Sequence, residues 1–186
     1  MVRSSLTLAF VHGEQWDGWY GDVELFDLGK ALEAQLYGSR EQLEGHPFFA
    51  EHPLLLSRLV SKLTYCVRDA PPRYIAVDMS NAADQGSFNI ALYTDDHLFH
   101  LAYDPTVDHI VTTIVGRQTI SRVEVLAAPN FMAGETPGTY RGSVKVLATY
   151  EDLKVQLPGD NLATEKNREQ LDLFLTSLFK DLSRNN

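Results

Sequence analysis

Hydrophobic and polar residues follow two different periods along this chain, and the period changes near residue 72. After Pro72, seven short runs are rich in β-branched and aromatic residues and are separated by turn residues, which predicts strands. Seven short strands joined by short turns predict an antiparallel meander that closes into a barrel or folds into two stacked sheets. The runs are residues 74–79, 88–93, 97–103, 107–115, 119–128, 140–150 and 153–157.

The last stretch, residues 164–182, has a helical period. Its apolar residues recur at i, i+3, i+4, i+7, i+8 and i+11, which places them on one stripe of an α-helix. We expect this helix to cover the strand-rich region that precedes it. The stripe consists of Leu171, Phe174, Leu175, Leu178, Phe179 and Leu182.

The first 72 residues predict a strand and a helical subregion. Residues 5–12 form a short apolar run typical of a strand, and residues 13–22 form an irregular loop with three aromatic residues. Residues 22–37 and 54–69 have helical spacing, and the prolines at 71 and 72 end the second helix. The sequence therefore predicts an α+β protein with two parts, an N-terminal strand and helical subregion (1–72) and a β-barrel with a C-terminal helix (73–186).

The amino-acid composition of the chain disfavours several classes of binding partner. The chain has 186 residues and a net charge of −9, which disfavours nucleic acid and anionic membranes as partners. No apolar run approaches 18 residues, so we expect no membrane insertion. The single cysteine, Cys66, excludes an intrachain disulfide and is typical of a reducing, cytoplasmic setting.

The order of seven strands and one amphipathic C-terminal helix resembles the pleckstrin-homology-like (PH-like) superfold, especially bacterial PH-like domains. Three stretches carry the resemblance, residues 91–104 (ALYTDDHLFHLAYD), 119–128 (TISRVEVLAA) and 142–159 (GSVKVLATYEDLKVQLPG). The resemblance covers residues 73–182 and implies a partly open barrel of two orthogonal sheets that a helix caps at one end. It also implies a binding role, since members of this superfold mostly bind proteins, peptides or lipid headgroups. Lipid-binding members carry Lys and Arg in the first hairpin, whereas residues 80–86 here contain one acid and no base, which disfavours an anionic headgroup.

Residues with metal-binding or catalytic chemistry are few. Carboxylates and imidazoles cluster between residues 95 and 109, but His97 and His100 face opposite sides of a strand. Two turns at opposite ends of one strand of about eight residues, at about 3.3 Å each, lie too far apart for one metal. No phosphate-binding loop or Gly-x-Ser-x-Gly motif occurs. We therefore expect no catalytic, cofactor-binding or metal-binding residues, and no enzymatic activity. The cluster consists of Asp95, Asp96, His97, His100, Asp104, Asp108 and His109.

Two functional hypotheses follow. The first is a non-enzymatic binding or assembly module that contacts a protein partner or a second copy through residues 1–53 or an exposed sheet edge. The alternative is a small-molecule carrier or enzyme with a helix-grip fold and an apolar cavity between its sheet and C-terminal helix. The alternative requires residues 5–12 to lie in the main sheet beside the last strand. The candidate contact residues of the first hypothesis are Trp16, Trp19, Tyr20, Arg58 and Lys62.

Overall fold

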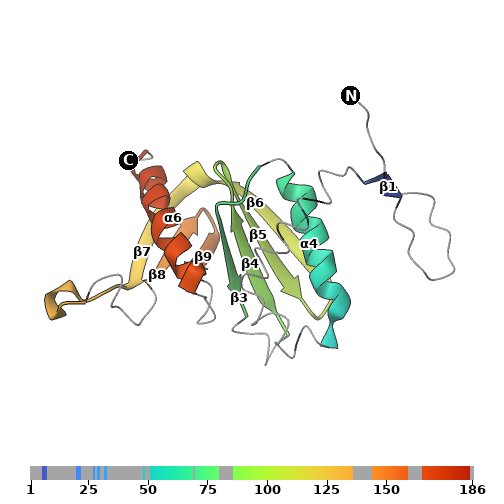
Figure 1. The fold of residues 1–186 in the computed structure, drawn as a ribbon, viewed down its shortest axis with the longest axis horizontal. Coiled ribbons are helices and arrows are strands. Elements are labelled where there is room, and N and C mark those ends of the chain that lie inside the picture. Colours follow the sequence, from blue (N-terminus) through green and yellow to red (C-terminus); the bar gives the residue numbers. More distant parts are fainter. Residues whose placement is uncertain are drawn as a thin grey trace.

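A computed structural model of the chain describes residues 6–7, 20–21, 27, 29, 32, 48, 51–68, 70–79, 86–135, 144–158 and 165–184. Within these residues, two long helices and two antiparallel sheets form the main body (Figure 1). Its elements are α4 (Pro53–Val67), β3 (Tyr74–Asp78), β4 (Phe88–Tyr93), β5 (His97–Asp104), β6 (His109–Gly116), η1 (Arg117–Thr119), β7 (Ile120–Ala127), η2 (Phe131–Ala133), β8 (Lys145–Tyr150), β9 (Leu153–Leu157) and α6 (Glu165–Arg184).

The seven main strands follow the chain order in each sheet. One sheet has the order β3-β4-β5-β6 and the other β7-β8-β9, and every neighbouring pair is antiparallel. The predicted α+β class, the seven antiparallel strands and the C-terminal helix are thus confirmed. No ladder joins the two sheets in the described part of the chain, so the strands do not close into a barrel.

The first sheet packs one face against α4, which lies across it on the right in Figure 1. Every second residue of β4 (Phe88, Ile90 and Leu92) points to this side, as the two-residue period of a strand requires. Helix α4 covers them with Leu55, Leu59, Leu63 and Val67. Leu32 and Phe48 belong to the same hydrophobic cluster, so residues on both sides of position 72 share one core.

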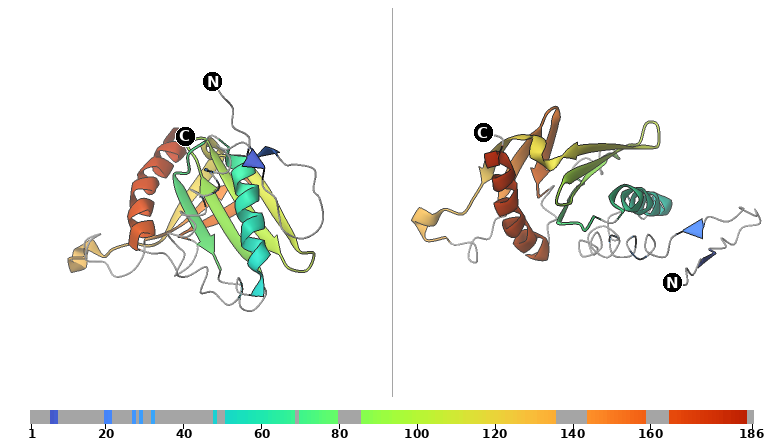
Figure 2. Two further views of the ribbon diagram at one scale, coloured as in Figure 1. Left: turned by 45° about the vertical axis from the view of Figure 1, so that its right-hand side comes forward. Right: turned by 90° about the horizontal axis from the view of Figure 1, so that it is seen from above.

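The opposite face of the first sheet packs against the second sheet and α6, as the two views in Figure 2 show. The alternate residues of β3 and β4 point to this side and meet apolar residues from β8 and β9. Strands β3, β4 and β5 are therefore covered on both faces, whereas most of β6 stays exposed. The large members of this second cluster are Tyr74, Tyr93, Leu98, Ile120, Val146, Tyr150, Val155, Leu157, Leu171, Phe174, Leu175 and Leu178.

The predicted stripe of α6 is buried over most of its length. The ring of Phe174 stacks on Tyr74, with ring centroids 5.2 Å apart, and is tilted against Tyr93 at 4.6 Å. Phe179 differs from the expectation, because 43% of its surface is exposed. The buried face is narrower than the stripe, and Phe179 lies at its margin.

The N-terminal elements are described only in part. β1 (Leu6–Thr7) pairs with β2 (Tyr20–Gly21) in a separate two-stranded sheet, so the end of the predicted aromatic loop is a strand. Residues 27, 29 and 32 are helical, within the helix predicted over 22–37. Trp16 and Trp19 lie outside the described residues. Among the described helices, none is both long and apolar enough to cross a membrane.

A matched pair of alanine substitutions tests the seating of α6. Phe174→Ala removes a ring that is 4% exposed, so we expect the free energy of unfolding to fall by about 3–5 kcal/mol. Phe179→Ala removes the same group from the half-exposed margin and is expected to cost about 1 kcal/mol or less. Urea denaturation measures both losses, and equal losses would contradict this assignment of the two rings.

Candidate functional site

A small polar hollow lies between the two sheets. On the inner face of the first sheet, Ala76, Ala91 and His100 form one row across three strands, because β3, β4 and β5 pair at these positions. Asp78 and Asn89 form the adjacent row on the same face. The two alanines leave space in front of β9, which closes the hollow with Lys154, Val155 and Gln156.

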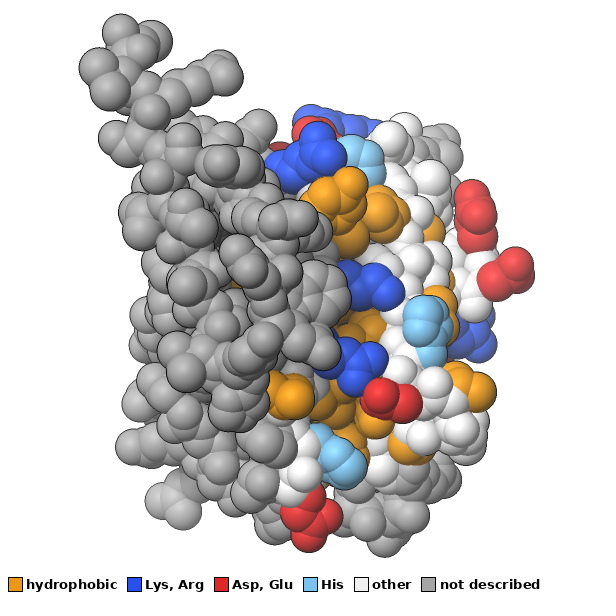
Figure 3. All heavy atoms as spheres, turned by 90° about the vertical axis from the view of Figure 1, so that its right-hand side faces the viewer, with side chains coloured by type: hydrophobic (Ala, Val, Ile, Leu, Met, Phe, Trp, Pro, Cys, Tyr) orange, Lys and Arg blue, Asp and Glu red, His pale blue; other side chains and the backbone are white. Residues whose placement is uncertain are grey.

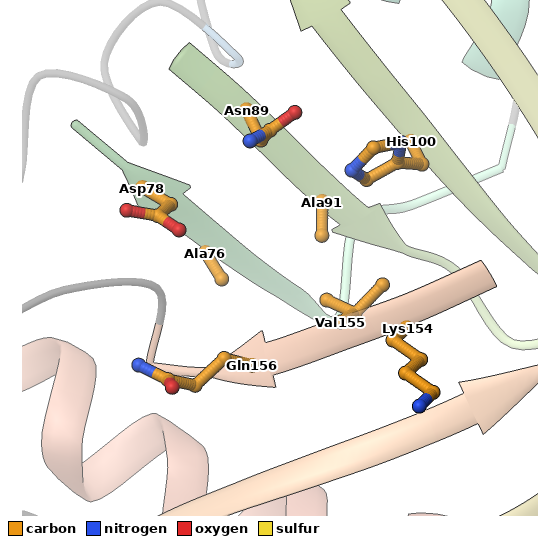
Figure 4. Close-up of a pocket in the computed structure, with 8 residues that line it drawn as sticks. All are labelled: Ala76, Asp78, Asn89, Ala91, His100, Lys154, Val155 and Gln156. Carbon is orange, nitrogen blue, oxygen red and sulfur yellow. The ribbon is translucent and has the colours of Figure 1, made fainter. Parts of the chain in front are cut away.

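Three neighbouring strands of the first sheet contribute polar side chains to this hollow, which are Asp78, Asn89 and His100 (Figure 4). Burial lowers the pKa of His100, because desolvation disfavours the imidazolium. Val155 points toward Ala91, whereas Lys154 points to the other side of β9 and is exposed (Figure 4). The hollow measures about 50 Å³, enough for a few water molecules at about 10–15 Å³ each. It is therefore too small for a substrate or an organic cofactor.

A larger hollow of about 310 Å³ lies beside α6. Its rim includes the ion pair of Arg73 and Asp95, whose side chains are 53% and 58% exposed. The hydrogen bonds from Arg73 lower the pKa of the Asp95 carboxyl. The hollow therefore combines an open, charged rim with an apolar wall, to which Leu173 and Phe174 of α6 contribute.

Arg117 lines the larger hollow and is itself 3% exposed. Its guanidinium donates to the carbonyl oxygen of Thr94 at 2.9 Å, to the hydroxyl of Ser177 at 2.7 Å and to the carboxylate of Asp181. It also lies 5.2 Å from the ring centroid of Phe174. A buried charge is tolerated only when it is paired in this way. Arg117 thus links the β4–β5 turn to α6 and is engaged inside the fold.

Arg58 and Lys62 lie together on α4, as the i, i+4 spacing predicts, and both contact the β5–β6 hairpin. Arg58 donates to both carboxylate oxygens of Asp108 at 3.0 Å and to its backbone oxygen. Lys62 donates to the backbone oxygen of Ile110. Figure 3 shows this face of the molecule, where Lys and Arg side chains lie among hydrophobic ones. Both residues attach α4 to the hairpin, and their contact with a partner stays a prediction.

The acidic and imidazole cluster is divided between two ends of one hairpin. Asp95, Asp96 and His97 lie at the β4–β5 turn, whereas Asp104 and His109 pair at the opposite end of β5 and β6. Asp104 accepts hydrogen bonds from the backbone and hydroxyl of Thr106. No group of three or more His, Cys, Asp or Glu side chains in the described part of the chain could hold a metal ion.

The described polar groups therefore form two hollows and several contacts within the fold. Comparison with known proteins finds no matching family model, curated protein or solved structure. The geometry of the described residues is accordingly the basis for the functional proposal. The fold separates three other polar residues of the strands: Asp78 lines the small hollow, Tyr74 packs against Phe174, and Arg122 pairs with Glu124 at 3.2 Å.

The sequence did not indicate two polar arrangements that the fold brings together, the hydrogen bonds of Arg117 and the polar lining of the small hollow. Arg117 stands alone in a break between two strands, and nothing in the local pattern distinguishes it from an exposed turn residue. Asp78, Asn89 and His100 come from three strands, so their proximity depends on the register of the sheet. All three residues alternate in phase with residues that point into the core, so the sequence indicates their direction. Only the register of the sheet shows that they lie close together.

The lowered pKa of His100 predicts part of the pH dependence of stability. The unfolded chain takes up a proton near the ordinary histidine pKa of about 6.5, whereas folded His100 resists protonation. Stability should therefore fall between about pH 7.5 and 5.5, and His100→Gln should reduce that fall. His109→Gln changes an exposed histidine and serves as the control. Urea midpoints at the two pH values measure the effect, and an unchanged fall in His100→Gln would contradict it.

Proposed function

We propose that this chain is a non-enzymatic module that binds a protein partner or assembles with a second copy. The main support is the size of the hollow between the sheets, about 50 Å³, which is far below the roughly 300–1,000 Å³ of small-molecule sites. The best-placed charged residues add to this support. Arg117, Arg58 and Lys62 all contact other parts of the same fold.

We further propose that residues 73–182 adopt a PH-like arrangement. Four strands, then three strands, then one helix follow each other in the order that the resemblance implies. Helix α6 lies against β7, η1 and β3, and so contacts both sheets. A binding role agrees with this arrangement, since PH-like domains mostly bind and seldom catalyse.

The partner in this proposal is a protein. Residues 80–86 carry one acid and no base, which disfavours an anionic lipid headgroup, and the net charge of −9 disfavours nucleic acid. The segment with Trp16, Trp19 and Tyr20 remains a proposed contact region, because aromatic residues are enriched in protein interfaces. A single cysteine agrees with a reducing, cytoplasmic setting.

A helix-grip carrier or enzyme is the second candidate. The hollow of about 310 Å³ beside the C-terminal helix favours it, since this volume reaches the lower limit of small-molecule sites at about 300 Å³. Strand pairing weighs against it. Leu6–Thr7 pairs with Tyr20–Gly21, and the last strand, β9, pairs with β8.

Titration with a fluorescent fatty acid separates the two candidates. A packed interior should give no saturable one-to-one binding and no rise in Tm with the probe. Phe174→Ala is the positive control, because a large-to-small change in a core leaves an apolar cavity that can admit such a probe. Stoichiometric binding to the unaltered chain would overturn the module and favour the carrier.

A further inference from the structure

Most backbone groups on the outer edge of β6 have no hydrogen-bond partner among the described residues, and the exception is the Ile110 carbonyl, which accepts from Lys62. His97 directs its backbone toward β4, because its carbonyl accepts from the amide of Thr94 at 2.9 Å and its amide donates to the Thr94 hydroxyl. Backbone direction alternates along an antiparallel pair, and His97 lies opposite Gly116. The even-numbered residues of β6 therefore turn their N–H and C=O groups away from β5. The bond from Lys62 to the outward carbonyl of Ile110 agrees with this direction.

Strand β6 is also the least protected edge of the two described main sheets. Its eight residues, HIVTTIVG, include no Asp, Glu, Lys, Arg or Pro, and Val111 and Ile114 are 49% and 52% exposed. Proteins normally guard such edges with charges, prolines, bulges or a covering element. The three other edges of the described main sheets have such guards.

Strand β7 has two register shifts and an Arg122–Glu124 ion pair. Strand β9 has five residues, carries exposed Lys154 and is followed by Pro158. Strand β3 also has five residues and lies against α6. β6 thus combines length, exposure and a run without charged residues of its own, which favour pairing with a further strand. The Lys62 ammonium lies at one end of this edge, at Ile110.

We propose that β6 pairs antiparallel with β6 of a second copy and joins two four-stranded sheets into one. The register that overlaps residues 110–116 of the two strands places Ile110 opposite Gly116 of the second copy and Thr112 opposite Ile114. Thr112, Ile114 and Gly116 of each strand then take part in the ladder, and the Ile110 carbonyl, which already accepts from Lys62, takes part through its second lone pair. The pairing is symmetric about a two-fold rotation axis, as a closed dimer requires. It covers Val111 and Ile114 of both copies.

Charge complementarity favours a second copy as the occupant. Two chains of net charge −9 repel each other, so they can approach best where neither strand carries charge. Lys62 bonds to the carbonyl of Ile110, and in this register Ile110 lies opposite Gly116 of the second copy. Lys62 therefore faces the end of the second copy's β6 at which Gly116 pairs with His97. The turn at that end carries Asp96, which is exposed and has no side-chain partner among the described residues. The two-fold axis repeats this Lys62–Asp96 pair.

This inference rests on the proposed binding role and specifies its partner. One pair of eight-residue strands is a small interface, of the class below about 1,200 Å² that is typical of weak complexes. We therefore expect a dimer that dissociates on dilution.

Sedimentation velocity of the full chain tests the pairing. The unaltered protein should shift from a 20.9 kDa monomer toward a dimer as its concentration rises from about 5 to 500 µM, a range suited to weak interfaces. Ile114→Lys places a charge on the open edge and should weaken association at least tenfold. Val125→Lys places the same charge at a residue of β7 that is 57% exposed and should leave association unchanged. Equal effects of the two substitutions would overturn the proposal.

A charge exchange tests the register. Lys62→Glu and Asp96→Lys should each weaken the dimer, and the double variant should recover most of the lost association. Additive losses in the double variant would overturn this register. A chain that is monomeric throughout the concentration range overturns the pairing. Slow hydrogen exchange at the Thr112 and Ile114 amides of the dilute monomer also overturns it, because the edge would then already be covered within one chain. A monomer that also excludes the fatty-acid probe leaves the binding role standing, whereas uptake of the probe overturns the role itself.

Discussion

The buried guanidinium of Arg117 holds the C-terminal helix over the gap between the two sheets. It bonds to Thr94 in the β4–β5 turn and to Ser177 and Asp181 in α6, and it lies over the ring of Phe174. An unpaired charge in this position would be costly, so the arginine is compatible with the fold only when α6 is in place. The packing of Phe174 and the pairing of Arg117 therefore fix the helix at the same point.

The distribution of apolar residues in the four-stranded sheet determines where function can lie. Both faces of β4 are buried, with Ile90 and Leu92 beneath α4 and Ala91 and Tyr93 beneath the second sheet and α6. A sheet that is covered twice leaves little interior space for a ligand, as the small hollow at His100 illustrates. Among the described residues, most of the exposed surface of this sheet lies at β6. This geometry is the physical reason for the proposal that the chain acts through contacts with other proteins.

The sequence predicted the seven strands and the last helix closely, because each depends on a local signal. Aromatic and aliphatic residues mark β4 and β5, and Thr94 and Asp104 provide the turn chemistry at their ends. The remaining features depend on long-range register. Arg58 and Asp108 are fifty positions apart in sequence, so no local pattern indicates their bond. The exposure of Phe179 was missed because the helical period does not show how wide the buried face is. The polar hollow was missed because its residues belong to four strands.

The coupling between Arg117 and Asp181 tests most directly whether this ion pair seats α6. A double-mutant cycle of Arg117→Met and Asp181→Asn, measured by urea denaturation, compares the double variant with the two single variants. Each single substitution leaves one charged group without its countercharge, whereas the double substitution removes both charges. We therefore predict that the double variant loses less stability than the sum of the single variants, by at least about 1 kcal/mol. Losses that add within about 0.5 kcal/mol would show that the two groups do not act together and would contradict the account.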